Sequence, residues 1–413
     1  MNLTSLPDSL EKPLDSLKKF AAVTRRGTAH EAFLNDIDAT VVVSGTRGKS
    51  GLTRRVSETL TDRGRDALGK VTGNHPKMLY GGEEYPIERG DRVTLYENAD
   101  EVQRFEGADT LVLENQAIGE YTTRLVNGRF TDPDVVVLTN VRRDHIDRLG
   151  SNRMEIARSF ARSIPDGAHV VNGEQTPEIR SYFEETFADR DVTLTHVSVP
   201  EEHRAVPGAE TIHAIDEVLD ALGEPPLARE RLLSYLDEMH VEWTDLAGGR
   251  VFDAASVNDV DSTEAIREAL CQGRVDVVQP FLYLRGDRRA RTNSFLNYLT
   301  GLYREGKIER AYVAGETTDL FASRAPFPVT VADDDPETAL GDALADGWPV
   351  LVMGNTVADY MRELAADIDR RESESAVRDR LDATVVGSDE LPNAAATSRT
   401  EPETTINTPT NDD

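Results

Sequence analysis

The sequence predicts an α/β protein made of two domains and a tail, and three observations support this fold class. Short runs of β-branched residues alternate with helical segments, which is typical of buried parallel strands. The alternation occurs twice, before and after a Gly-Gly pair near residue 248. The 413 residues also suffice for two domains with sizeable cores.

The first domain is expected at residues 37–248. Residues 1–36 form an N-terminal helical segment, because apolar residues recur every three or four positions in LDSLKKFAAV. The strand TVVVSG at 40–45 leads into a helix from about Lys49. Helices are also expected at ETIHAIDEVLDAL and RERLLSYLDEM, on either side of EPPLA. Further strands are expected at 109–115, 134–140 and 168–174, with another before the segment 69–76.

The second, smaller domain is expected at residues 249–370, as a Rossmann-like α/β unit. Residues 371–413 read as a helical end and a disordered acidic tail, since from Gly387 onward there are no aromatic residues and few apolar ones. The strands expected in this domain are 249–255, 280–286, 310–316, 327–333 and 348–355.

The charge balance restricts the partners. The net charge is −29, with 75 acidic residues against 39 arginines and only 7 lysines. Nucleic acid is therefore not expected as a partner, since both would be polyanions. Such a surface repels itself at low salt, and the balance resembles that of proteins from salt-loving archaea.

The sequence also favours a cytoplasmic location. No run of about 18 apolar residues could cross a membrane, so no membrane span of its own is expected, and the N-terminus has no secretory pattern. The one cysteine, Cys271, excludes an internal disulfide and a cysteine metal cluster, and is expected to be buried in a helix.

A phosphate-binding loop is predicted directly after the first strand. Its small residues let backbone N–H groups face an anion, a lysine can reach the terminal phosphates, and a serine hydroxyl can reach Mg²⁺. Val43 replaces the first glycine of the long form of this motif. The pattern alone also fits an ordinary surface turn, but the preceding strand favours the phosphate loop. Its residues are Gly45, Thr46, Arg47, Gly48, Lys49 and Ser50.

Residues near other strand ends are candidates for the same site. Magnesium prefers oxygen ligands, and Glu114 ends a strand, where open α/β sheets place binding residues. Thr72 and Asn74 follow another possible strand, and His145 lies in NVRRDHIDRLG. His145 alone fits a hydrogen-bonded loop residue as well as a ligand. In RGDRRAR, four arginines surround Asp287, which suits an anionic nucleotide or carboxylate.

The ordered motifs resemble the ATP-dependent Mur ligase superfamily, most closely the ligase subunit of poly-γ-glutamate synthase. GTRGKS followed by TR, a T-G turn, a strand-ending Glu and N-V-R-x-D-H appear in that order. In the second domain, SVNDVDSTEAI, LRGDRRART and VMGN resemble further family segments. The likeness covers roughly residues 38–365, discontinuously.

The resemblance implies a P-loop Mur-ligase-like domain whose substrates include ATP with Mg²⁺. Lys49 and the loop amides would hold the β- and γ-phosphates. Among the metal ligands, Ser50 and Glu114 would hold one Mg²⁺, His145 would help hold a second, and Thr72 would position the metal shell. Asn258 and Asp259 would lie near the nucleotide, with Asp287 on the ribose and Arg288 beside it. Lys49, Glu114 and His145 would be the catalytic residues.

The resemblance also implies a substrate and partners. A carboxylate would become an acyl phosphate that an amine attacks, with glutamate or a poly-γ-glutamate chain as substrate. A membrane subunit of a capsule-synthesis complex would be the protein partner. Another Mur-like amino-acid or peptide ligase, a P-loop NTPase that drives a partner, and a nucleotide-binding module without chemistry remain as alternatives.

Three departures from the family pattern affect these expectations. Gly51 stands where many relatives have Thr or Ser, and the turn at 72–74 reads T-G-N rather than T-T-G-T. No lysine occurs between Lys77 and Lys307, so the carbamoylated lysine of many Mur ligases has no counterpart. Only 44 residues precede the loop, so the family's domain for nucleotide-sugar substrates is not expected.

Overall fold

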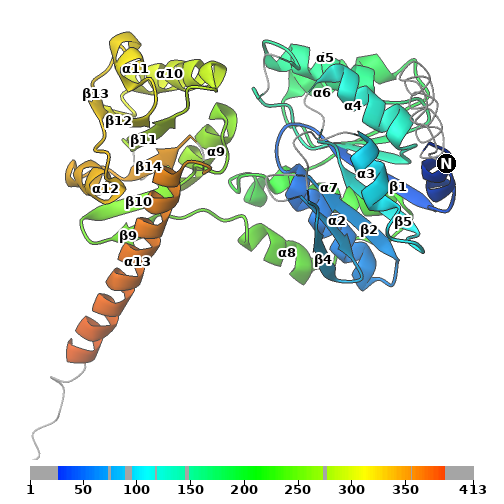
Figure 1. The fold of residues 1–413 in the computed structure, drawn as a ribbon, viewed down its shortest axis with the longest axis horizontal. Helices are drawn as coiled ribbons and strands as arrows, with labels where there is room; N and C mark the ends of the chain where they lie inside the picture. The colour runs from blue at the N-terminus through cyan, green and yellow to red at the C-terminus, as the bar shows by residue number, and fades with distance from the viewer. Residues whose placement is uncertain are drawn as a thin grey trace, which may run out of the picture.

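The computed structural model describes residues 27–72, 76–88, 95–116, 119–144, 148–272, 277–354 and 356–386. It places two parallel-type sheets in separate lobes, each with helices on both faces (Figure 1). The α/β class predicted from the sequence is confirmed. Of the N-terminal segment expected to be helical, residues 27–35 are helical and 1–26 lie outside the described residues.

The first sheet has eight strands in the order β4-β3-β2-β5-β1-β6-β7-β8. All neighbours from β2 to β8 pair in parallel, whereas β3 and β4 form an antiparallel edge. The strands are β1 (Ala39–Ser44), β2 (Ala67–Val71), β3 (Lys77–Tyr80), β4 (Glu83–Pro86), β5 (Thr110–Glu114), β6 (Val135–Leu138), β7 (His169–Asn172) and β8 (Thr193–His196).

The helices of this lobe bury both faces of the sheet. Val41 and Val43 of β1 pack with the helices α2, α7 and α8, whereas Val42 between them packs on the opposite face. The helical elements are α2 (Lys49–Asp62), α3 (Leu95–Val102), α4 (Glu120–Leu125), the π-helix Val126–Phe130, α5 (Arg153–Ser163), α6 (Pro177–Phe187), the short Glu201–His203, α7 (Ala209–Ala221) and α8 (Arg229–Asp237).

The second sheet has six strands in the order β13-β12-β11-β14-β10-β9. Only β9 runs antiparallel to its neighbour. The strands are β9 (Thr244–Leu246), β10 (Gly249–Asp253), β11 (Gln279–Leu284), β12 (Ala311–Gly315), β13 (Val329–Val331) and β14 (Val350–Met353). The helices are α9 (Val260–Cys271), α10 (Arg289–Arg304), α11 (Thr318–Arg324), α12 (Pro336–Ala345) and α13 (Asp359–Val386).

Each strand expected with stated bounds matches an observed one to within two residues at either end. The strand expected before the segment 69–76 is β2, which extends into that segment as far as Val71, and Cys271 is buried at the end of α9 as predicted. The division between domains at residue 248 remains a prediction. Because β9 pairs with β10, we propose that the second domain begins before Thr244. The expected disordered tail, from Gly387, lies outside the described residues. Within the part of the chain that the structure describes, no helix combines the length and apolarity of a membrane span.

Candidate functional site

The predicted phosphate loop joins β1 to α2, and two glycines shape it. Gly45 and Gly48 have φ angles of 107° and 81°, a region that favours glycine. A Cβ atom on Gly45 would overlap the hydroxyl of Thr139 and lie 2.7 Å from its backbone nitrogen. Helix α2 begins at Lys49, so its first N–H groups open onto the loop. This is the strand–turn–helix arrangement that an anion-binding loop requires.

Lys49 folds back over the loop. Its Nζ donates hydrogen bonds of 2.9 Å to the carbonyl oxygens of both Gly45 and Thr46. Burial lowers the pKa of this ammonium, while the charge of Glu114 acts in the opposite direction. The lysine is therefore held at the loop and near a carboxylate.

Ser50 and Glu114 form the pair that the metal prediction requires. Glu114 ends β5, and its Oε2 accepts hydrogen bonds from Ser50 Oγ at 2.9 Å and from the backbone N–H of Thr72 at 2.7 Å. Only 5% of Glu114 is exposed. A hydroxyl and a buried carboxylate at this spacing fit a hard divalent cation. Thr72 reaches the pair through its backbone.

All of the metal-ligand assignments, including that of Ser50 and Glu114, remain predictions. His145, the other expected ligand, lies outside the described residues, which omit 145–147, and so does the candidate Asn74, since 73–75 are omitted as well. Within the described ranges, no cluster of three or more His, Cys, Asp or Glu side chains is arranged to hold a metal. Asp144, next to the gap, instead accepts a 2.7 Å hydrogen bond from Arg47 Nη2.

Asn140 braces the phosphate loop. It follows β6, and its Oδ1 accepts from the backbone N–H of Arg47 at 3.0 Å while its Nδ2 donates to the Arg47 carbonyl at 3.2 Å. Its Nδ2 also donates to Glu210 at the start of α7. These bonds fix the loop backbone between its two glycines.

Asn258 and Asp259 precede α9 in the second lobe. Asp259 caps the helix by accepting from Ser262 N at 2.9 Å and Ser262 Oγ at 2.7 Å. Its Oδ2 also accepts from Arg47 Nε at 2.8 Å, so it contacts the phosphate loop directly. Asn258 has a φ of 59°, and its Oδ1 accepts from Arg291.

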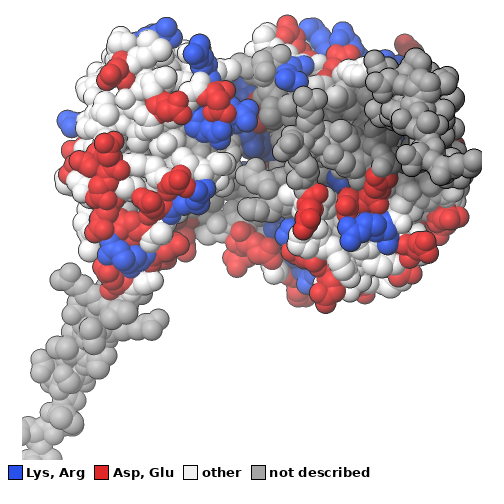
Figure 2. All heavy atoms as spheres, viewed as in Figure 1, with Lys and Arg blue, Asp and Glu red and all other residues white. Residues whose placement is uncertain are grey.

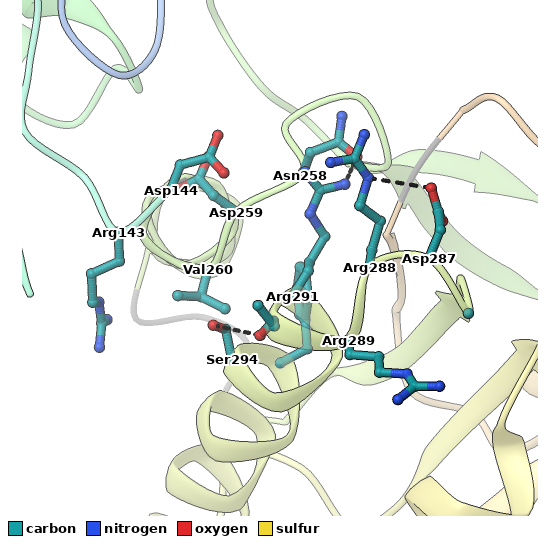
Figure 3. A pocket seen from close by; sticks show the side chains of 13 residues that line it. Arg143, Asp144, Asn258, Asp259, Val260, Asp287, Arg288, Arg289, Arg291 and Ser294 are labelled. Atoms are coloured by element: carbon teal, nitrogen blue, oxygen red, sulfur yellow. Dashed lines mark hydrogen bonds and ion pairs between the residues drawn. The ribbon is translucent and has the colours of Figure 1, made fainter. Parts of the chain in front are cut away.

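Asp287 and Arg288 line a cavity of about 350 Å³ (Figure 3). Arg285 donates two hydrogen bonds to Asp287, at 2.9 and 2.8 Å, and holds the pKa of that carboxyl below its usual range. Burial, together with neighbouring arginines, lowers the pKa of Arg291. The cavity is lined by Arg143, Asp144, Asn258, Asp259, Val260, Gly286, Asp287, Arg288, Arg289, Ala290, Arg291, Ser294 and Phe295.

The predicted residues therefore fall into two groups. Lys49, Ser50, Thr72 and Glu114 gather at the phosphate loop, whereas Asn258, Asp259, Asp287 and Arg288 line the cavity. Arg47 connects the groups, because it bonds to Asp144 and Asp259, which both line the cavity. In Figure 2, basic side chains of the left lobe lie beside the hollow between the lobes, and acidic and basic side chains are interspersed over the rest of that face.

Each of the two lobes matches the model of a known protein family. Residues 43–213 match the Mur ligase middle domain, and residues 239–373 match the poly-gamma-glutamate synthase CapB C-terminal domain. This chain joins a Mur ligase middle domain to a CapB C-terminal domain. The resemblance predicted from the motifs is thereby confirmed.

Two curated relatives match part of the chain. The capsule biosynthesis protein CapB of Bacillus anthracis is 29% identical over 174 residues, 40% of this chain and 36% of the relative. The PGA synthase CapB of Bacillus subtilis (strain 168) is 28% identical over 170 residues, 40% of this chain and 43% of the relative. Each match thus spans less than half of the relative.

Solved structures confirm the fold over most of the chain. The E. coli FolC structure in complex with DHPP and ADP has a TM-score of 0.58 at 19% identity and covers 86% of this chain and 93% of FolC. The Mycobacterium tuberculosis folylpolyglutamate synthase complexed with ADP and AMPPCP gives 0.58 at 15% identity, covering 82% and 94%. At such identities the likeness concerns the fold alone.

Sequence reasoning gave no role to two residues of the Mur ligase middle domain that support the loop. Asn140 ends the run DVVVLTN, so its position after a strand could have singled it out. Glu210 carried no such signal. Glu210 belongs to the site because the first turn of α7 packs against the loop. The Oε1 atom of Glu210 accepts hydrogen bonds from both Asn140 and Arg142.

Proposed function

We propose that this chain is an ATP-dependent amide ligase that activates a carboxylate as an acyl phosphate for attack by an amino group. The observation that carries the proposal is the Ser50–Glu114 pair beside Lys49, in a chain that joins a Mur ligase middle domain to a CapB C-terminal domain. Phosphoryl transfer depends on positioning and charge more than on a protein nucleophile, and these residues offer both.

In this proposal the residues of the first lobe hold the reacting phosphates. Lys49 and the N–H groups at the start of α2 bind the β- and γ-phosphates of ATP. Ser50, Glu114 and His145 are the proposed Mg²⁺ ligands, with Thr72 at the metal shell. When bound, Mg²⁺ neutralises phosphate charge. The loop residues Gly45, Thr46, Arg47 and Gly48 shape the phosphate cradle.

Residues of the second lobe would hold the remainder of the nucleotide. Asp287 is exposed and acidic, and it is fixed in place by Arg285, which suits a ribose hydroxyl. Arg288 and Asn258 line the same cavity and offer a cation and an amide. Asp259 reaches the site from the start of α9.

We infer that the substrate is glutamate or a poly-γ-glutamate chain, joined through side-chain carboxylates. The support is the CapB C-terminal domain and the names of the matching relatives, a capsule biosynthesis protein and a PGA synthase. The proposed location is the cytoplasm, with attachment to the membrane through a membrane subunit of a capsule-synthesis complex. The acidic composition would suit a salt-rich, halophilic interior.

The test is ADP release in molar KCl with Mg²⁺, with and without glutamate. Glutamate should stimulate release, and mass spectrometry should find a γ-linked product. Lys49→Ala should reduce release about a hundredfold, because the terminal phosphates lose their main cation. Lys77→Ala is the matched control, since Lys77 pairs with Glu84 on the antiparallel edge of the same sheet.

Two outcomes would count against this function. ADP release that ignores glutamate would favour another substrate or a plain NTPase that drives a partner. An unchanged rate in Lys49→Ala would remove the phosphate loop from the reaction altogether.

A further inference from the structure

Three arginines of the first lobe donate hydrogen bonds to residues at the start of α9 in the second lobe. Arg47 Nε donates to Asp259 at 2.8 Å, and Arg142 Nη1 donates to Ser262 Oγ at 2.6 Å. Arg143 donates to Asp261 from its Nη2 at 2.6 Å, its Nε at 3.0 Å and its backbone N–H at 2.7 Å. Helix α9 lies on the side of its lobe that faces the first lobe (Figure 1).

The contact of Arg47 is the most enclosed of the ionic contacts in this group. The Asp259 side chain is 1% exposed and that of Arg47 is 26% exposed, whereas Arg143 is 54% exposed. Coulombic attraction is stronger where water is excluded, and an enclosed charge that loses its partner is costly. The Arg143 contact is of the exposed kind that contributes little.

Each end of the Arg47–Asp259 contact is also held by contacts within its own lobe. Asn140 holds the Arg47 backbone on both its N–H and its carbonyl side. Asp259 is fixed as the cap of α9, and Asp144 holds the second arm of the Arg47 guanidinium at 2.7 Å. Because both side chains are already held, forming the contact costs little side-chain entropy. The contact can therefore fix the position of the second lobe relative to the first.

We propose that Arg47 is a positioning residue that holds the second domain at the phosphate loop through Asp259. The contact sets where the wall formed by Asn258, Asp287 and Arg288 stands relative to Lys49 and Ser50. In this role the Arg47 side chain binds a protein carboxylate, and phosphate binding is left to Lys49 and the loop N–H groups. The kinetic part of the inference rests on the proposed ligase function, whereas the structural part does not.

The test is a double-mutant cycle of Arg47→Gln and Asp259→Asn. Asparagine retains the cap of α9, since its side-chain oxygen can still accept from Ser262. Arg54→Gln is the matched control, because Arg54 also lies near the start of α2 but its partner Glu84 belongs to the first sheet. The measurements are the radius of gyration by X-ray scattering, the affinity for Mg·ADP by calorimetry, and kcat and KM for ATP.

Each single variant should enlarge the radius of gyration and lower kcat about tenfold or more, with KM for ATP within about threefold of wild type. The double variant should be no worse than either single one, because both remove the same contact. Arg54→Gln should resemble wild type. If Arg47→Gln does not fold, Arg47→Lys keeps the charge but loses the fork that spans two carboxylates, and should give an intermediate effect.

Opposite results would overturn the inference. A large loss of Mg·ADP affinity in Arg47→Gln at unchanged radius of gyration would make Arg47 a direct phosphate ligand. Fully additive effects in the double variant would mean that Arg47 and Asp259 act separately. If the wild-type chain lacks glutamate-dependent ADP release, the proposed function fails, but scattering and calorimetry still decide the role of Arg47.

Discussion

Substitution of Glu114 should separate the structural role of this carboxylate from its proposed metal role. Its Oε2 accepts two hydrogen bonds, from the Ser50 hydroxyl and the Thr72 N–H. Glu114→Ala removes the acceptor of both hydrogen bonds. Thr72 is 5% exposed, so its N–H should cost about 2 kcal/mol, whereas the partly exposed Ser50 should cost about 1 kcal/mol. The free energy of unfolding should therefore fall by about 3 kcal/mol.

Glu114→Gln keeps an acceptor at the same place. It should cost only about 1 kcal/mol, since bonds to an ionised oxygen are roughly twice as strong as neutral ones. Urea unfolding at constant KCl measures both losses. Without the charge, the Mg²⁺-dependent gain in ADP affinity should fall about tenfold or more in either variant, as calorimetry with and without Mg²⁺ would report.

The control is Glu83→Gln, an exposed glutamate on β4, which should change neither quantity. Two results would refute the reasoning. If Glu114→Gln kept the full Mg²⁺-dependent affinity, Glu114 would not be a metal ligand. If the two variants were equally unstable, the hydrogen bonds to Ser50 and Thr72 would not be what stabilises this end of β5.

Three further predictions concern stability, each measured by urea unfolding. Gly45→Ala should lower the free energy of unfolding by about 2 kcal/mol, because the position has a positive φ and an added Cβ would overlap Thr139. Gly81→Ala is the control, since Gly81 also has a positive φ, of 60°, but has open space around it. A loss in Gly45→Ala no larger than that in Gly81→Ala would contradict the prediction. Burial and nearby His203 lower the pKa of His213 below 6.5, so the unfolded chain binds more protons just below that pH and stability should rise with pH through this window. His213→Gln should flatten part of that rise, and an unchanged slope would exclude His213 as a source. At a net charge of −29, KCl should raise the urea midpoint by screening repulsion, and a midpoint independent of KCl would show that repulsion is not limiting.

The sequence predicts best what depends on short, apolar patterns. The valine run of β1 and the GKS that follows it place the strand, the loop and the first residue of α2 correctly, because each has a local physical cause. The buried strands of the second sheet are found for the same reason. Similar apolar runs occur in β5, β6 and β14, which read TLVLE, VVVL and VLVM.

The edge strands β4, β8 and β9 and the long-range contacts escape this reasoning. β4 reads EEYP and is exposed along its length, so it has the composition of a loop, and only pairing with β3 makes it a strand. The bond between Arg47 and Asp259 joins residues 212 positions apart. The loop motif singles out Arg47, but no local pattern identifies Asp259 as its partner, which follows only from how the two lobes meet.

The strand order has a consequence for how the protein acquires its site during folding. β1 lies between β5 and β6, so the loop after β1 contacts residues that are distant in the sequence. Ser50 bonds to Glu114, 64 positions away, and Arg47 bonds to Asn140, 93 positions away. Contacts between such distant segments close large chain loops and form late. Nucleotide affinity would thus appear only when the central sheet is assembled. During refolding, the appearance of nucleotide binding would therefore mark the completion of folding better than the appearance of helix content would.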